Sequence, residues 1–159
     1  MRSPPISFVK TKDDAGNLPV VCVGGSAGGR DAYTRLLRNL PADLGVAVVI
    51  VNHLKTVATR LHAILPRFTA MPVELITEKL IIRPNHVFII PEQRDLHVLN
   101  GEFRLKPISK PRGWPDVITV FLKSLTKHWD GQLVAIIVSV TTGLAGPVQA
   151  TSAASSICL

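Results

Sequence analysis

The sequence is poor in cysteine, and this scarcity excludes two classes of small protein. Only two cysteines occur among its 159 residues, Cys22 inside an apolar run and Cys158 next to the last residue. Two thiols placed in this way provide neither a disulfide framework nor a cluster of metal ligands. We therefore expect both to be ordinary thiols, and we expect no metal and no other cofactor.

Long apolar runs are also missing. The longest ones, 46–51 and 133–138, are six residues each, whereas a membrane-crossing helix needs roughly 20. The first residues show no signal-peptide pattern. With 47% hydrophobic residues, the chain has enough apolar side chains for one buried core. We expect a single domain in the cytoplasm, without membrane insertion.

Acidic and aromatic residues are scarce as well, and the chain is basic. It has 18 Lys and Arg against 11 Asp and Glu, a formal net charge of +7, and 5% aromatic residues. Clustered basic residues would suggest binding to nucleic acid, but here they are dispersed and no recognition helix is evident. We expect no nucleic-acid partner, and a solvated basic surface that favours an acidic partner.

Short β-branched runs alternate with stretches of helical periodicity. We expect strands at 20–23, 46–51, 73–76, 86–90 and 133–138, and helices at 33–40, 59–68 and 117–128. The Asn100-Gly101 turn predicts a peripheral β-hairpin from 96–99 and 103–105. This order predicts an α/β fold, doubly wound around a mostly parallel sheet, with ligands beyond the carboxyl ends of its strands.

A glycine-rich turn separates the first predicted strand from the first predicted helix. Residues 23–29 read Val-Gly-Gly-Ser-Ala-Gly-Gly, so Gly24, Ser26 and Gly28 satisfy the G-x-S-x-G pattern of a nucleophile elbow. Such a turn presents the serine hydroxyl at a helix N-terminus. Free amide groups there, near Ala27 and Gly28, can stabilise an oxyanion.

Two other readings of this turn stay open. Glycines that open a helix after a strand also bind phosphate groups. Against that reading, Ser26 replaces the second glycine of G-x-G-x-x-G, Asn52-His53 rather than an acidic residue follows the second strand, and no Gly-Lys-Ser/Thr follows. The third reading is a glycine-rich turn without chemistry.

His53 favours the nucleophile reading. It comes directly after the second buried strand, so a parallel sheet brings it to the edge that presents Ser26. An imidazole within about 3 Å of a hydroxyl can act as its general base. The remaining histidines lack that placement, and we set them aside: His62, His86, His97 and His128.

Four segments then resemble successive landmarks of the CheB methylesterase family. They are 24–29, Leu40-Pro41-Ala42-Asp43, Asn52-His53 and 83–91, which reads Arg-Pro-Asn-His-Val-Phe-Ile-Ile-Pro. Segments 92–96 and 116–125 are similar to the form of the family that is fused to methyltransferase and sensory domains. The resemblance covers 18–139.

The resemblance implies an activity and roles for individual residues. It implies hydrolysis of γ-glutamyl methyl esters on a methylated chemoreceptor or signalling protein, with release of methanol. Ser26 would be the nucleophile and His53 its base, with the oxyanion bound near Ala27 and Gly28 and in the loop after Ser139.

The sequence departs from the family where the third triad member is expected. In the family, the strand that corresponds to 133–138 leads into a glycine-rich loop that contains the triad aspartate, whereas this sequence has no acidic residue after Asp130. Asp31 and Asp116 are conceivable replacements. Because loss of a triad carboxylate reduces turnover about 10⁴-fold elsewhere, we expect a weak or inactive esterase. The alternative is a non-catalytic module that binds a receptor or partner.

The predicted organisation has three parts. They are a flexible leader at 1–17, a partial methylesterase domain at 18–139 and a divergent or frameshifted tail at 140–159, which leaves the sheet incomplete at its C-terminal side. Loss of one G after the Ser139 codon would turn a family-like Gly-Tyr-Asp-Gly-Ala-Gly into Val-Thr-Thr-Gly-Leu-Ala. That is the sequence of 140–145.

Overall fold

The structure is a computed structural model that describes residues 18–25, 30–52, 58–109 and 117–138. Within these ranges the elements are β1 (Val20–Gly25), α1 (Arg30–Asn39), β2 (Ala47–Asn52), α2 (Ala58–Ile64), the 3₁₀ turn η2 (Leu65–Arg67), β3 (Val73–Leu75), β4 (His86–Ile89), β5 (Arg94–Leu99), β6 (Glu102–Pro107), α3 (Val117–His128) and β7 (Leu133–Val138). Strands and helices thus alternate along most of the chain, as the apolar periodicity predicts.

Five of the strands form one parallel sheet in the order β3-β4-β2-β1-β7. The runs at the centre of this sheet are uniformly apolar because both faces are covered, as is usual for parallel strands. Val48, Val49 and Ile50 on β2 are almost completely inaccessible to solvent. The expected α/β fold with a doubly wound parallel sheet is confirmed.

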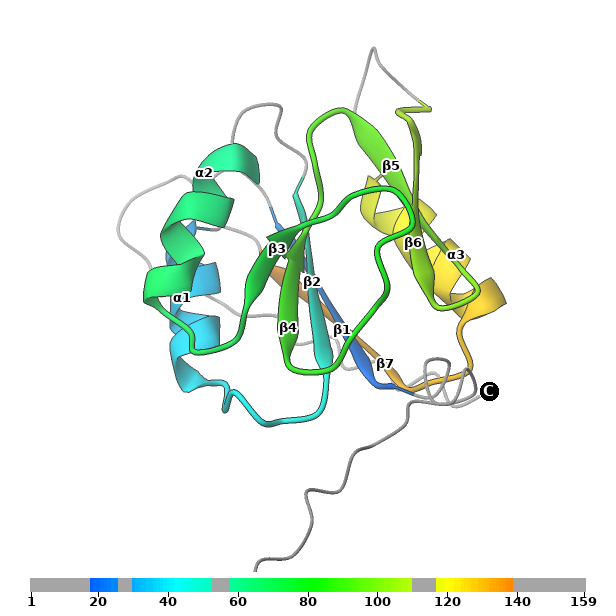
Figure 1. Cartoon of the computed structure of the whole chain (residues 1–159). Helices are drawn as coiled ribbons and strands as arrows, with labels where there is room; N and C mark the ends of the chain where they lie inside the picture. The colour runs from blue at the N-terminus through cyan, green and yellow to red at the C-terminus, as the bar shows by residue number, and fades with distance from the viewer. Residues whose placement is uncertain (1–17, 26–29, 53–57, 110–116, 139–159) are drawn as a thin grey trace, which may run out of the picture.

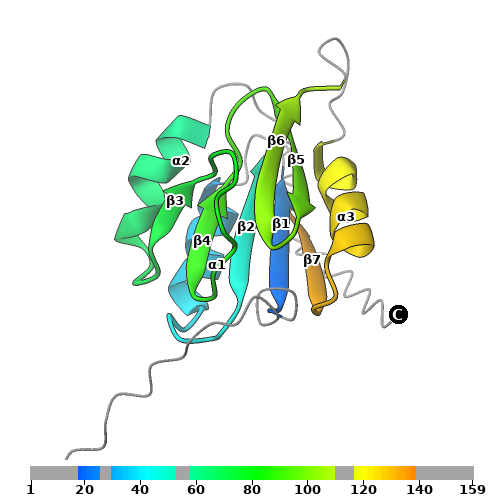
Figure 2. The ribbon, with the colours of Figure 1, turned by 45° about the vertical axis from the view of Figure 1, so that its right-hand side comes forward.

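Two layers cover the sheet, one on each face (Figures 1 and 2). Helices α1 and α2 pack on one face through Tyr33, Leu37 and Leu61, against Val23 and Ile50 among others. The hairpin β5-β6 and helix α3 cover the other face. Its core consists of Cys22, Val49, Phe88, Leu96, Val98, Phe103, Phe121, Leu125 and their neighbours.

The hairpin lies outside the five-stranded sheet, as expected, but its inner face belongs to the core. Leu96, Val98 and Phe103 are at most 1% exposed, and the Phe103 ring packs edge-on against Phe88 of β4 at a centroid distance of 5.0 Å. The connection from β3 to β4 also runs alongside β6. Lys79 N–H donates to the carbonyl of Phe103, whose N–H donates to Leu80 O, at 2.9 and 2.8 Å.

The helix predicted at 59–68 is α-helical only in its first part and ends in a 3₁₀ turn. The α-helix stops at Ile64, and the 3₁₀ turn η2 contains Pro66. Proline has no N–H to donate and its ring crowds the preceding turn, so the last turn tightens. Arg38 of α1 lies over the ring of Phe68 just beyond, 4.6 Å from its centroid.

None of the helices in the described part of the chain is long and apolar enough to cross a membrane. The predicted leader 1–17 and the tail 140–159 lie outside the described residues.

Candidate active site at the carboxyl edge of the sheet

The register of the sheet aligns the ends of its strands. Ile136, Val23, Ile50 and Ile89 form one row across β7, β1, β2 and β4. At the last rung, Gly25 of β1 lies opposite both Asn52 of β2 and Val138 of β7. Three neighbouring strands therefore end at the same level of the same edge.

The candidate catalytic residues follow these ends directly. Ser26 comes after Gly25, and His53 comes after Asn52. Ser26, Ala27, Gly28 and His53 all lie outside the described residues, so their roles stay predictions. Their strands, in contrast, are adjacent and parallel, and adjacent strands are separated by about 4.8 Å.

The strand residues next to this edge are buried and apolar. Val23, Ile50 and Val51 are at most 1% exposed. Helix α1 begins at Arg30, shortly after the glycine-rich segment of the sequence, and carries Asp31 in its first turn. A turn between a buried strand and a helix is the setting that a nucleophile elbow requires.

The third neighbour in this arrangement is β7. Ser139 follows Val138 as Ser26 follows Gly25, and no acidic residue comes after it in the sequence. Asp130 precedes β7, and the amide of Val20 at the start of β1 donates to the carbonyl of Gln132. Asp130 therefore lies near the amino end of the strands, away from the candidate site, as expected.

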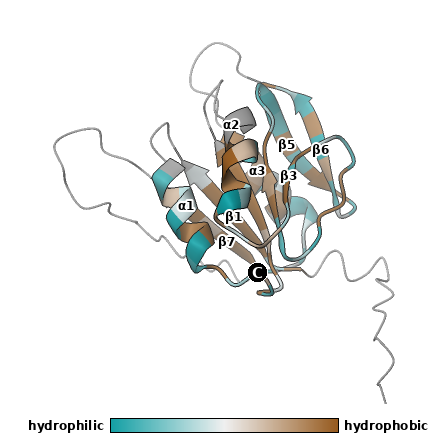
Figure 3. Ribbon diagram, turned by 60° about the vertical axis from the view of Figure 1, so that its left-hand side comes forward, coloured by the Kyte–Doolittle hydropathy of each residue, from teal (hydrophilic) through white to brown (hydrophobic). Residues whose placement is uncertain are grey.

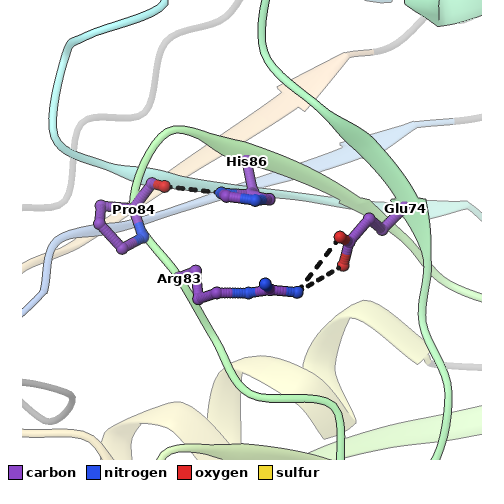
Figure 4. A network of polar contacts seen from close by, with 4 residues as sticks. All are labelled: Glu74, Arg83, Pro84 and His86. Atoms are coloured by element: carbon purple, nitrogen blue, oxygen red, sulfur yellow. Dashed lines mark hydrogen bonds and ion pairs between the residues drawn. The ribbon is translucent and has the colours of Figure 1, made fainter.

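His86 lies at the amino edge as well, where it takes part in a structural network (Figure 4). Its Nδ1 lies 2.7 Å from the carbonyl oxygen of Pro84, and its ring stacks on Phe88. Next to it, Arg83 donates from one amino group to both carboxylate oxygens of Glu74 at 3.2 Å. This network joins β3 to the start of β4 and is far from the strand ends that precede Ser26 and His53.

The other described histidines are also elsewhere. His62 is exposed on α2, and His128 is exposed in the last turn of α3. His97 lies on β5, where burial, followed by the charge of Lys106, lowers the pKa of its imidazole. None of these three positions is at a strand end of the parallel sheet.

The base of the hairpin adds polar residues that the sequence reasoning left unassigned. After β4 the chain passes through Glu92 and Arg94 into β5, so these residues lie on the carboxyl side of the sheet. Asp95 is only 4% exposed and its Oδ2 accepts a hydrogen bond from the Ser109 amide at 2.9 Å. In the sequence, Asp95 stands directly before the alternating run 96–99. A carboxylate buried beside such a run needs a hydrogen-bond partner, and this position was the available signal.

The sequence from residue 21 to residue 144 matches the CheB methylesterase family. This match spans most of the chain. The chain belongs to the CheB methylesterase family. Similar curated proteins carry the name protein-glutamate methylesterase/protein-glutamine glutaminase. One from Burkholderia thailandensis is 30% identical over 124 residues, and one from Burkholderia lata is 28% identical over 129.

These alignments cover 76% and 79% of this chain but only 36% and 38% of the two relatives. The chain thus spans little more than a third of their length. Among solved structures, the CheB methylesterase catalytic domain of Thermotoga maritima matches with a TM-score of 0.66 at 21% identity, over 76% of this chain and 66% of that one. At this identity, the structural likeness supports the CheB catalytic fold.

Within residues 18–25, 30–52, 58–109 and 117–138, no group of three His, Cys, Asp or Glu residues could hold a metal ion.

Proposed function

We propose that this chain is a protein-glutamate methylesterase-like domain that acts on γ-glutamyl methyl esters of a chemoreceptor or related signalling protein in the cytoplasm, with Ser26 as nucleophile and His53 as general base. Its activity is weak, because no acidic residue follows Asp130 to complete the triad. The single observation that carries the proposal is the register of β1 and β2. Gly25 and Asn52 are paired at the last rung of the sheet, and Ser26 and His53 are the next residues on each strand.

The reaction follows from these two groups. His53 would take the proton of the Ser26 hydroxyl as its oxygen attacks the ester carbonyl. Amide groups near Ala27 and Gly28 would stabilise the oxyanion. The protonated imidazole would then give its proton to the departing methoxide, which leaves as methanol. Water, activated by the same imidazole, would hydrolyse the acyl-enzyme to free the glutamate and Ser26.

An active-site serine probe tests the proposal. A fluorophosphonate should label the folded chain at Ser26, and Ser26→Ala should abolish the label. His53→Ala should slow labelling by about 10²- to 10⁴-fold, the usual contribution of a general base. His62→Ala, on an exposed face of α2, is the matched control and should label at the unchanged rate.

A folded sample without any label at Ser26 would contradict the proposed esterase activity. The remaining candidate would then be a non-catalytic module that binds a receptor or partner, a function that the family match does not favour. Because the relatives are also named glutaminases, the same sample is tested on a γ-glutamyl amide and a γ-glutamyl methyl ester. We expect faster release of methanol than of ammonia, since methoxide is the better leaving group.

The proposal extends to the organisation of the chain: a leader at 1–17, the methylesterase domain at 18–139 and a tail at 140–159 that diverges from the family. Sequencing the gene around codon 139 tests the origin of the tail. An Asp-Gly in the adjacent reading frame would support a lost nucleotide, and its absence would support divergence.

A further inference from the structure

We propose that an exposed cluster of three arginines, Arg35, Arg38 and Arg67, is a docking surface for an acidic helical segment of a partner protein. The cluster lies on the layer of α1, α2 and η2 that covers one face of the sheet (Figure 1). Its side chains all belong to the described part of the chain. The proposal goes beyond the proposed function and is independent of the chemistry at the candidate active site.

The three arginines gather where α1 meets η2. Arg35 and Arg38 are one turn apart on α1, and residues at this spacing are neighbours on a helix surface. The guanidinium carbon of Arg38 lies 4.6 Å from the centroid of the Phe68 ring. Arg67, the last residue of η2, directly precedes Phe68. All three arginine side chains are exposed.

The positive charge of the cluster is not neutralised by any residue that the structure describes. The ion pairs within the described ranges lie on other elements: Arg83–Glu74, Arg104–Glu78 and Arg104–Glu102. Like charges one turn apart on a helix repel each other. A negative group that binds beside Arg35 and Arg38 would relieve this repulsion.

The contact with Phe68 prepares Arg38 to bind a carboxylate. A cation–π contact uses the flat face of the guanidinium and leaves the N–H groups at its edge available. The described residues provide no acceptor for these N–H groups. A guanidinium edge binds a carboxylate through two parallel hydrogen bonds. The stacked ring therefore holds a carboxylate-binding edge in place before a partner arrives.

The spacing of the cluster favours a short acidic helix over a nucleic acid. Carboxylates three or four residues apart on a second helix repeat at about 5 Å, the rise of one turn, and this repeat matches Arg35 and Arg38. A nucleic acid needs a longer basic track. Here Asp31 in the first turn of α1 and Asp43 beyond its end are both exposed, so they would repel a polyanion that extends past the cluster.

The helix dipole explains only one member of the cluster. Arg38 lies in the last turn of α1, where a positive charge is stabilising. Arg35 lies in the middle of this helix, and Arg67 lies on a different element. Their common location therefore needs another reason, which a bound acidic partner supplies.

The 159 residues of the chain do not supply the acidic segment themselves. Residues 1–17 contain two acidic residues against three basic ones, and no acidic residue follows Asp130. A second copy carries the same net charge of +7, which opposes docking of one copy on another. The partner that fits the cluster is a different protein.

The test measures binding of a fluorescent, alanine-rich helical peptide with glutamates four residues apart to the full chain, by anisotropy at low salt. We expect the triple variant Arg35→Gln/Arg38→Gln/Arg67→Gln to bind this peptide about 10-fold more weakly than wild type, because it loses three charge pairs. A peptide of the same composition with glutamates two residues apart should bind wild type about 3-fold more weakly, since its carboxylates lie on different helix faces.

The matched control is Lys79→Gln/Lys123→Gln/Lys127→Gln, which removes the same charge from exposed positions on other elements. It should change binding by less than about 2-fold. Equal losses in the two triple variants, or equal binding of the two peptides, would overturn the proposal.

Two further measurements separate other occupants of the cluster. A single-stranded oligonucleotide with the same number of negative charges should bind more weakly than the peptide, and stronger binding would overturn the proposal in favour of a phosphate polyanion. Sedimentation should show the same oligomeric state for wild type and the arginine variant. Self-association that the arginine variant loses would assign the surface to a second copy and overturn the proposal as well.

Discussion

At the scale of single residues, Tyr33 and Cys22 place polar atoms inside the core, on opposite faces of the sheet. Tyr33 is 1% exposed, and its hydroxyl has no hydrogen-bond partner among the described residues. Burial, followed by the nearby Cys22, raises the pKa of this hydroxyl. Both observations describe a phenol that is held in apolar surroundings.

Tyr33→Phe should therefore keep the fold and raise the free energy of unfolding by about 1 kcal/mol, because it removes a buried hydroxyl that finds no partner. Urea unfolding measures the effect, and Tyr33→Leu, which removes the ring as well, should destabilise. A loss of stability in Tyr33→Phe would show that the hydroxyl is bonded in solution.

Cys22 predicts a dependence of stability on alkaline pH. Burial raises the pKa of its thiol from 9.0 to about 12. The folded pKa is the higher one, so the stability contribution is present below pH 9 and declines as the pH rises towards 12, by up to about 1.4 kcal/mol per pH unit. Denaturant unfolding across this range should show a shallower decline for Cys22→Ala than for wild type, and parallel curves would contradict the assignment.

At the scale of elements, Ser124 connects α3 to the hairpin. Its hydroxyl accepts the Val98 amide at 2.8 Å and lies 3.4 Å from the Val98 carbonyl, in a position to donate to it. The helix thereby satisfies backbone groups at the free edge of β5.

Ser124→Ala leaves a buried amide without its acceptor and should cost about 1–3 kcal/mol of unfolding free energy. Thr126→Ala is the matched control on the same helix, since among the described residues its exposed hydroxyl bonds only the Lys123 carbonyl within α3. It should change stability by less than about 0.5 kcal/mol. Equal effects of the two substitutions would remove Ser124 from this role.

The elements themselves were largely predictable because local chemistry determines them. β-branched runs gave the central strands, and Asn100-Gly101 gave the hairpin turn, where both residues adopt positive φ. The burial of the hairpin was harder to foresee, since a period-two run shows that one face is apolar but not what it contacts. Phe103 packs on Phe88 of β4, and Leu96 belongs to the same core cluster. Only the tertiary arrangement brings these residues together.

The candidate site was predictable in part for the same reason. The placement of Ser26 and His53 after two buried parallel strands could be read from the sequence. The order β3-β4-β2-β1-β7 could not, because it depends on which strands pair across long connections.

At the scale of the whole molecule, β7 lies at an edge of the described sheet. Among the described strands it pairs only with β1, and Val134 is 43% exposed. Figure 3 shows apolar colour along β7. An apolar edge strand is a template for pairing with other chains.

Val134→Lys should therefore reduce concentration-dependent association, measured by light scattering, while the free energy of unfolding changes by no more than about 0.5 kcal/mol. Ile81→Lys is the control, since Ile81 is 53% exposed but lies on the connection beside β6. Association that falls equally in both variants would point to net charge rather than to the β7 edge.

The position of β1 between β2 and β7 has a consequence for how the protein is made. Of the described strands, β1 is the first to leave the ribosome and β7 is the last, yet they are neighbours. The indole of Trp129 also donates to the carbonyl of Leu18, 111 positions earlier. A growing chain thus carries β1 paired on one side only until β7 has been made, and the sheet edge that precedes Ser26 is completed only when β7 emerges.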